Sequence, residues 1–116
     1  MSTLMMSRFV MGAVLLVTSL ATPATAQDAK AVQGARVYAD QKCAMCHSIS
    51  DKGNKKGRLD DVGLRLSVFD LRGWLVDAKG MTTKTRAPRK PEMKNYDLHR
   101  DDIDALVAYM ATLKKK

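Results

Sequence analysis

Both cysteines of the chain and one of its two histidines fall within five consecutive positions, as Cys43, Cys46 and His47. Four chemistries use thiols at this spacing: a structural disulfide, a redox dithiol, a zinc site and covalent haem attachment. A disulfide here would close a very small loop and constrain the unfolded chain little. A redox pair needs a strand-to-helix setting, and a zinc site needs a fourth ligand, although the other histidine, His99, is more than fifty residues away.

The histidine directly after the second cysteine favours covalent haem. In that chemistry the two thiols add across the vinyl groups of the porphyrin, and the adjacent imidazole ligates the iron. We therefore expect one haem c, bound through two thioether bonds from Cys43 and Cys46, with His47 as an iron ligand.

The N-terminus has the pattern of an export signal. Arg8 precedes an uncharged, mostly apolar run from Phe9 to Ala21, and small residues follow at 24–26. A retained membrane anchor is the alternative, but the run of 13 residues is shorter than the roughly 20 that a span requires. The pattern predicts a cleaved signal peptide over residues 1–26 and a periplasmic domain over residues 27–116. Export fits haem attachment, which takes place outside the cytoplasm.

The charge of the chain points to acidic partners. The sequence has 20 Lys and Arg against 12 Asp and Glu, a formal net charge of +8. Such a balance favours nucleic acid, an anionic membrane or an acidic protein surface, and export argues against nucleic acid. Residues 27–116 are enough for one small domain. The hydrophobic core of such a domain is small, so we expect a further stabilising element.

Apolar residues at helical spacing predict three helices, which position the motif. The first begins behind Asp28 and runs to the cysteines; the second is capped by Ser67 and ended by Gly80; the third is capped by Asp101. The third has an apolar stripe of Ile103, Leu106, Val107 and Met110. No segment alternates like a half-buried strand, so we predict an all-α fold with basic loops at 50–63 and 80–97.

The motif and its flanks resemble the small single-haem class I cytochromes c of bacteria. The resemblance covers residues 34–113 and rests on CAMCH, on GARVY before it and on LVAYMATL in the last helix. It implies the cytochrome c fold, with three main helices wrapped around one haem. It also implies that Leu106 and Tyr109 cross the first helix near Gly34, where a missing side chain lets two backbones approach.

Two positions depart from the family pattern. Tyr38 stands five residues before Cys43, where the family's aromatic commonly stands four before, so either the first helix is distorted or Val37 shares the packing. The family's loop after the haem histidine often reads Gly-Pro-x-Leu, and the proline carbonyl accepts a hydrogen bond from the histidine. Here Arg58 follows Gly57, and we expect the Arg58 carbonyl to accept that bond.

A six-coordinate electron carrier needs a second iron ligand. Met110 belongs to the apolar stripe, and His99 is most simply a solvated turn residue. Met81 directly follows Gly80, close to the predicted middle helix. Met93 lies late in the long loop, after Pro91, and resembles the family's proline-then-methionine approach to the last helix. We therefore expect Met93 to be the ligand, with Met81 as the alternative.

The resemblance implies a soluble periplasmic electron shuttle, not an enzyme, that carries single electrons between respiratory-chain partners. Its partners would be redox proteins with acidic docking surfaces, and it would act as a monomer, without nucleic acid and without stable membrane insertion after signal cleavage. The rival interpretation is a five-coordinate haem enzyme or gas-binding sensor, in which no protein side chain closes the second face of the iron.

Overall fold

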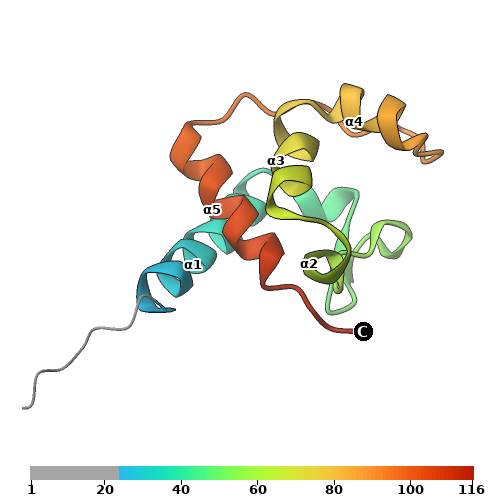
Figure 1. Cartoon of the computed structure of the whole chain (residues 1–116). Helices are drawn as coiled ribbons and strands as arrows, with labels where there is room; N and C mark the ends of the chain where they lie inside the picture. The colour runs from blue at the N-terminus through green and yellow to red at the C-terminus, as the bar shows by residue number, and fades with distance from the viewer. Residues whose placement is uncertain (1–23) are drawn as a thin grey trace, which may run out of the picture.

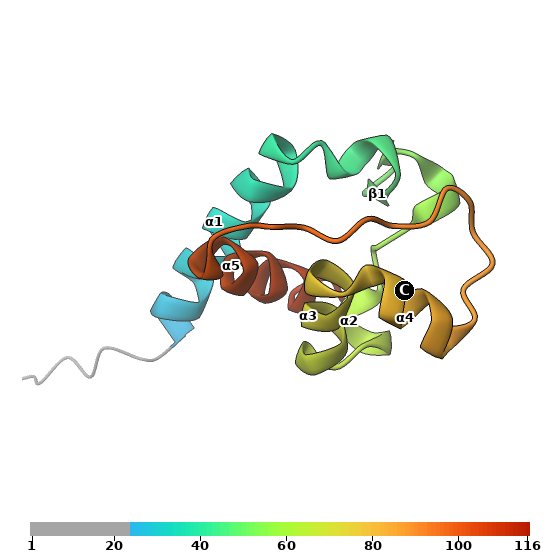
Figure 2. The ribbon, with the colours of Figure 1, turned by 90° about the horizontal axis from the view of Figure 1, so that it is seen from above.

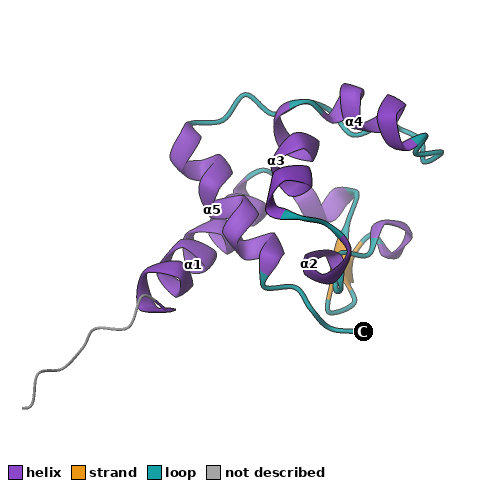
Figure 3. Cartoon of the chain, in the orientation of Figure 1, coloured by secondary structure: helices purple, strands orange, loops and turns teal. Residues whose placement is uncertain are grey.

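The structure, a computed structural model, describes residues 24–116, in which helices are joined by loops and by one short β hairpin (Figures 1 and 3). Of the predicted signal peptide, residues 1–26, the first 23 lie outside the described residues. In chain order the elements are α1 (Ala24–Asp40), the 3-10 helix η1 (Cys43–Met45), β1 (Ser48–Ile49), β2 (Lys52–Gly53), the 3-10 helix η2 (Lys55–Gly57), α2 (Val62–Arg65), α3 (Val68–Val76), α4 (Ala78–Thr85) and α5 (Arg100–Ala111).

The first and last long helices, α1 and α5, cross at Gly34, as predicted (Figure 1). A Cβ on Gly34 would lie 2.0 Å from the Ala105 carbonyl oxygen and 2.6 Å from the Tyr109 Cβ, so only glycine allows this approach. The rings of Tyr38 and Tyr109 meet edge to face beside the crossing, with centroids 5.9 Å apart. Helix α1 is continuous to Asp40 and Val37 is buried, so Val37 shares the packing and the helix is not distorted.

The hydrophobic core lies where α5 meets α1, α2 and α3. The predicted stripe of α5 is buried along its length, since Ile103, Leu106, Val107 and Met110 are all less than 8% exposed. From the other side the core receives Leu71 and Leu75 of α3 and Val62 of α2. An ion pair between Arg72 and Asp104 joins α3 to α5 at the edge of this core.

The predicted middle helix is two helices, so the expectation that Gly80 ends it was wrong. Ser67 does cap α3, because its side chain accepts the Asp70 N–H at 3.1 Å. The break comes at Asp77, which ends α3 and caps α4 by accepting the Gly80 N–H at 3.1 Å. A Cβ on Gly80 would lie 2.2 Å from the Asp77 carboxylate, so this glycine makes room for the cap of a new helix.

Two helices also begin earlier than predicted. Helix α1 begins at Ala24, ahead of Asp28, and α5 is capped by His99, whose Nδ1 accepts the Asp101 N–H at 3.3 Å. Asp101 then lies in the first turn, where its negative charge favours the helix dipole. The antiparallel β1–β2 hairpin was not predicted, because two residues per strand are too few to show alternation.

The long loop between α4 and α5 spans residues 86–99 and crosses the molecule (Figure 2). In the view of Figure 2 it passes between the α1-to-β1 segment and the α3–α4 pair. The Tyr96 N–H donates to the Leu75 carbonyl at 2.8 Å, which fixes the loop to the end of α3. No helix within residues 24–116 is long and apolar enough to cross a membrane.

Candidate functional site

Cys43 and Cys46 lie on one tight turn directly after α1. Lys42 adopts the left-handed conformation, with φ of 55°, and so ends the helix and turns the chain into η1. The Cys43 carbonyl accepts the N–H groups of Cys46 at 3.1 Å and His47 at 2.9 Å. The motif is therefore one hydrogen-bonded unit, in which both thiols are free, Cys43 is half-buried and Cys46 is exposed.

Asn54 braces this turn, a role that sequence reasoning missed. Its backbone N–H is shared between the carbonyls of His47 at 2.9 Å and Ala44 at 3.1 Å, and its side-chain Nδ2 donates to the Met45 carbonyl at 3.3 Å. Gly53 makes the approach possible, since its φ is +104° and a Cβ there would lie 2.2 Å from the His47 carbonyl oxygen. The Gly-Asn pair is a recognisable turn signal, but its hydrogen-bond partners are not visible in the sequence.

The His47 ring is oriented by a backbone carbonyl. Its Nδ1 lies 3.0 Å from the Gly57 carbonyl oxygen, which can only accept, so Nδ1 carries the proton and Nε2 is left for a metal. The expectation that Arg58 provides this acceptor was wrong, and Gly57 takes the place of the family's proline. Burial lowers the pKa of His47, and the charge of Arg89 lowers it further, against the raising effect of the Gly57 bond.

A cavity of about 520 Å³ opens beside Cys46. One wall comes from the motif and the residues after it, and the other from the long loop; the lining residues are Met45, Cys46, Asn54, Lys56, Pro88, Arg89, Lys90 and Pro91. The volume lies within the range of roughly 300–1,000 Å³ for small-molecule and cofactor sites. Exposed Met45, prolines and aliphatic stems offer apolar surface, and three cations surround the opening.

Met93 lies on the segment of the long loop that approaches the cysteines. It is half-buried against the core, and its neighbour Lys94 lies close enough to Cys43 for its charge to lower the pKa of that thiol, although burial raises this pKa by more. Lys94 also sits over the Tyr96 ring, 5.0 Å from its centroid. Lys94 and Tyr96 thus lie near the cysteines, whereas the Asn95 side chain accepts the Lys79 N–H of α4 at 3.2 Å.

Met81 packs instead between α3 and α4. It is 9% exposed, and its sulfur lies 3.0 Å from the position of a Cβ on Gly73. This thioether therefore occupies a helix–helix contact. Met110 is a core residue of α5, and His99 caps that helix with a side chain that is 76% exposed. Met81 and Met110 are buried in helix packing and His99 caps α5, which leaves Met93 among the four candidates for the second ligand, and its role stays a prediction.

The residues present fit a covalently attached haem. Two free thiols lie on one turn, and an imidazole has its Nδ1 held and its Nε2 available. Of these groups only Cys46 lines the cavity described above. Cys43, Cys46, His47 and Met93 would hold the group. Within residues 24–116 no three side chains of His, Cys, Asp or Glu come together as a metal site, so the zinc alternative has no ligand set there.

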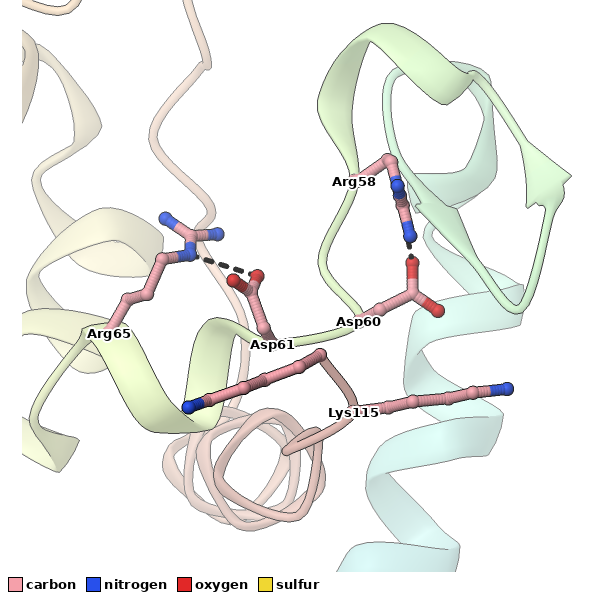
Figure 4. A pocket seen from close by; sticks show the side chains of 6 residues that line it. Arg58, Asp60, Asp61, Arg65 and Lys115 are labelled. Carbon is pink, nitrogen blue, oxygen red and sulfur yellow. Dashed lines mark hydrogen bonds and ion pairs between the residues drawn. The ribbon is translucent and has the colours of Figure 1, made fainter.

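A second cavity, of about 340 Å³, has only charged lining residues, as Figure 4 shows: Arg58, Asp60, Asp61, Arg65, Lys115 and Lys116. Arg58 pairs with Asp60, and Arg65 with Asp61. This cavity contains no cysteine, histidine or methionine and is distinct from the candidate site. Beside it the Lys115 N–H donates to the Asp60 carbonyl at 2.9 Å, which joins the C-terminal residues to the segment before α2.

Comparison with known families gives one match: the model described as Cytochrome c matches residues 31–114. The matched region contains every candidate site residue and extends from α1 to the residues after α5. No curated protein and no solved structure matches the chain.

Proposed function

Because this chain belongs to the cytochrome c family, as a class I single-haem member, we propose that it is a soluble periplasmic shuttle that carries one electron at a time between respiratory-chain partners. Membership makes it an electron-transfer protein with haem c; the compartment, the partners and the ligand set are our proposal. When bound, the haem supplies one-electron exchange at its iron.

The observation that supports this proposal most directly is the orientation of His47. The Nδ1–H of this ring donates to the Gly57 carbonyl, and burial lowers the pKa of His47, which favours the neutral imidazole that ligates a metal. Met93 would hold the iron together with His47, so that protein side chains would close the site to added ligands. Such closure excludes added ligands and suits a carrier better than an enzyme or a gas sensor.

The basic residues around the cavity suit an acidic partner. Lys56, Arg89 and Lys90 line the opening next to Cys46, and Lys94 lies on the same loop. Like-signed charge around the place where an electron leaves would steer an acidic surface to it and allow rapid release. The periplasmic location rests on the export pattern of the N-terminus, and monomeric action on the small size of the domain.

Ionic strength tests the docking proposal with defined probes. The holoprotein would be oxidised by an anionic iron complex, hexacyanoferrate, and by a cationic cobalt complex in stopped-flow measurements. We expect the rate with the anion to fall as salt is added, because the Debye length shortens from about 30 Å at 0.01 M to about 8 Å at 0.15 M. The rate with the cation should rise.

Charge reversals locate the surface. Lys90→Glu with Lys94→Glu should slow the reaction with the anion at low salt and flatten its salt dependence. Lys114→Glu with Lys116→Glu makes the same change in charge at the C-terminus, beside the other cavity, and should have a smaller effect. Equal effects of the two pairs would refute docking at the Cys46 opening. Carbon monoxide tests the rival: ready binding to the ferrous wild-type protein would indicate an open, five-coordinate site.

A further inference from the structure

The Arg89 side chain extends from the long loop to Gly57, whose carbonyl accepts the His47 hydrogen bond. A Cβ on Gly57 would lie 2.0 Å from the Arg89 Nη1 and 2.9 Å from its Cζ. The guanidinium thus occupies the space that a side chain at position 57 would fill. The same Cβ would lie 2.3 Å from the Cys46 carbonyl oxygen, so the guanidinium stands at the junction between the motif and the acceptor of the His47 hydrogen bond.

Within residues 24–116, no carboxylate of the chain pairs with Arg89, whereas its neighbour Lys90 pairs with Glu92. Arg89 is also half-buried, whereas Lys90 is exposed. A half-buried, uncompensated charge is less screened by solvent and salt than an exposed one. Its field at His47 should therefore persist at physiological ionic strength.

We propose that Arg89 is a positioning residue for the His47 side of the iron site. Its guanidinium packs over Gly57, holds the long loop against the loop that orients His47, and places a fixed positive charge beside the His47–Gly57 hydrogen bond. The proposal rests on haem attachment through His47, but not on Met93 or on the identity of any partner.

The fixed charge has a definite electrical consequence. Oxidation adds one positive charge at the iron, and a nearby cation makes that addition less favourable. The cation also weakens the Gly57 carbonyl as an acceptor, so the imidazole donates less electron density to the metal. Both effects stabilise the ferrous form, and Arg89 should raise the reduction potential.

The test is protein-film or solution voltammetry of the holoprotein variants. Arg89→Gln removes the charge and should lower the reduction potential, and the shift should survive at high salt. Lys90→Gln is the matched control, because it removes a neighbouring charge that lines the same cavity but is exposed and paired. Its shift should be smaller and should disappear with salt. Arg89→Lys keeps the charge without the planar guanidinium. Its reduction potential should therefore lie between those of Arg89→Gln and the wild type.

Gly57→Ala tests the contact itself. The added methyl group should displace the guanidinium and also press on the Cys46 carbonyl oxygen, so the potential should fall. The part of this effect that comes from the guanidinium should not add to that of Arg89→Gln, because both remove one interaction. Equal shifts for Arg89→Gln and Lys90→Gln, or full additivity with Gly57→Ala, would overturn the proposal. A wild-type protein without covalent haem would overturn the proposed function itself, whereas an Arg89→Gln protein with normal haem content and an unchanged potential would overturn only the role of Arg89.

Discussion

Gly34 of α1 lies directly against the backbone of Ala105 in α5, so closely that a Cβ on Gly34 would come within 2.0 Å of the Ala105 carbonyl oxygen. The obstacle is backbone and cannot rotate away. The crossing also positions the cysteine motif, because η1 begins only a few residues after the crossing segment of α1 ends. A change at Gly34 should therefore affect both the stability of the domain and the setting of the motif.

We expect Gly34→Ala to destabilise the domain by about 1–3 kcal/mol, as overpacking does in other cores. The sign is informative, because alanine at an open helix position would stabilise by roughly 0.5–1 kcal/mol relative to glycine. Chemical denaturation of the holoprotein measures the difference. Ala39→Val, on the exposed side of α1, is the control and should change the free energy of unfolding much less. A Gly34→Ala protein as stable as the wild type would disprove the close crossing.

Met93 and Met81 should respond differently to truncation. Met93→Ala should give a folded haem protein that loses its weak far-red Met–Fe absorbance and binds added carbon monoxide. Met81→Ala should keep the absorbance but lose about 2–5 kcal/mol of stability, because Met81 is buried between α3 and α4. Visible spectra and thermal unfolding of both variants decide the matter. Loss of the absorbance in Met81→Ala alone would make Met81 the ligand.

Asn54 should matter for the integrity of the motif. Asn54→Ala removes the side-chain bonds to the Met45 carbonyl, at 3.3 Å, and from the Lys56 N–H, at 3.1 Å. Each hydrogen bond contributes roughly 0.5–1.5 kcal/mol, so unfolding should become easier by about 1–3 kcal/mol. Asn54→Asp keeps the acceptor for the Lys56 N–H but loses the donor to the Met45 carbonyl. Its melting temperature should therefore lie between those of the wild type and Asn54→Ala. If Asn54→Asp proves as damaging as Asn54→Ala, the Lys56 bond contributes nothing.

Asp60 should make the free energy of unfolding fall as the pH is lowered. The Ser50 N–H donates to its carboxylate at 2.8 Å and Arg58 lies beside it, and both hold the pKa of Asp60 below its usual 3.8. A lowered pKa in the folded state means that this stabilisation is present above about pH 3.8 and is lost as the pH falls through the folded-state value. Asp60→Asn should therefore lower the melting temperature at neutral pH and have little effect in strong acid.

Asp61→Asn provides the comparison for Asp60. Asp61 pairs with Arg65 one turn along α2, with 39% and 51% of the two side chains exposed. An exposed pair of this kind contributes little to stability, so the melting temperature should hardly change at any pH. A loss for Asp61→Asn that equals the loss for Asp60→Asn would show that the hydrogen bond from Ser50 to Asp60 has no special role.

Local patterns in the sequence determined the elements whose signals are local. The period of Ile103, Leu106, Val107 and Met110 predicted the buried face of α5, and Ser67 predicted the start of α3, because spacing and capping act within a few residues. The crossing at Gly34 was predicted by the family resemblance. The Cys43, Cys46 and His47 motif predicted the haem that family membership supports.

The tertiary structure decided between local signals of equal strength and also decided what depends on residues far apart in the chain. Asp77 rather than Gly80 separates α3 from α4, because a cap competes with a helix stop that looks equally good locally. Gly57 rather than Arg58 accepts the His47 bond, and Arg89 fills the space above Gly57, because these contacts depend on how two loops fold against each other. Loop-to-loop contacts join residues that no sequence period relates, and only the packed chain brings them together.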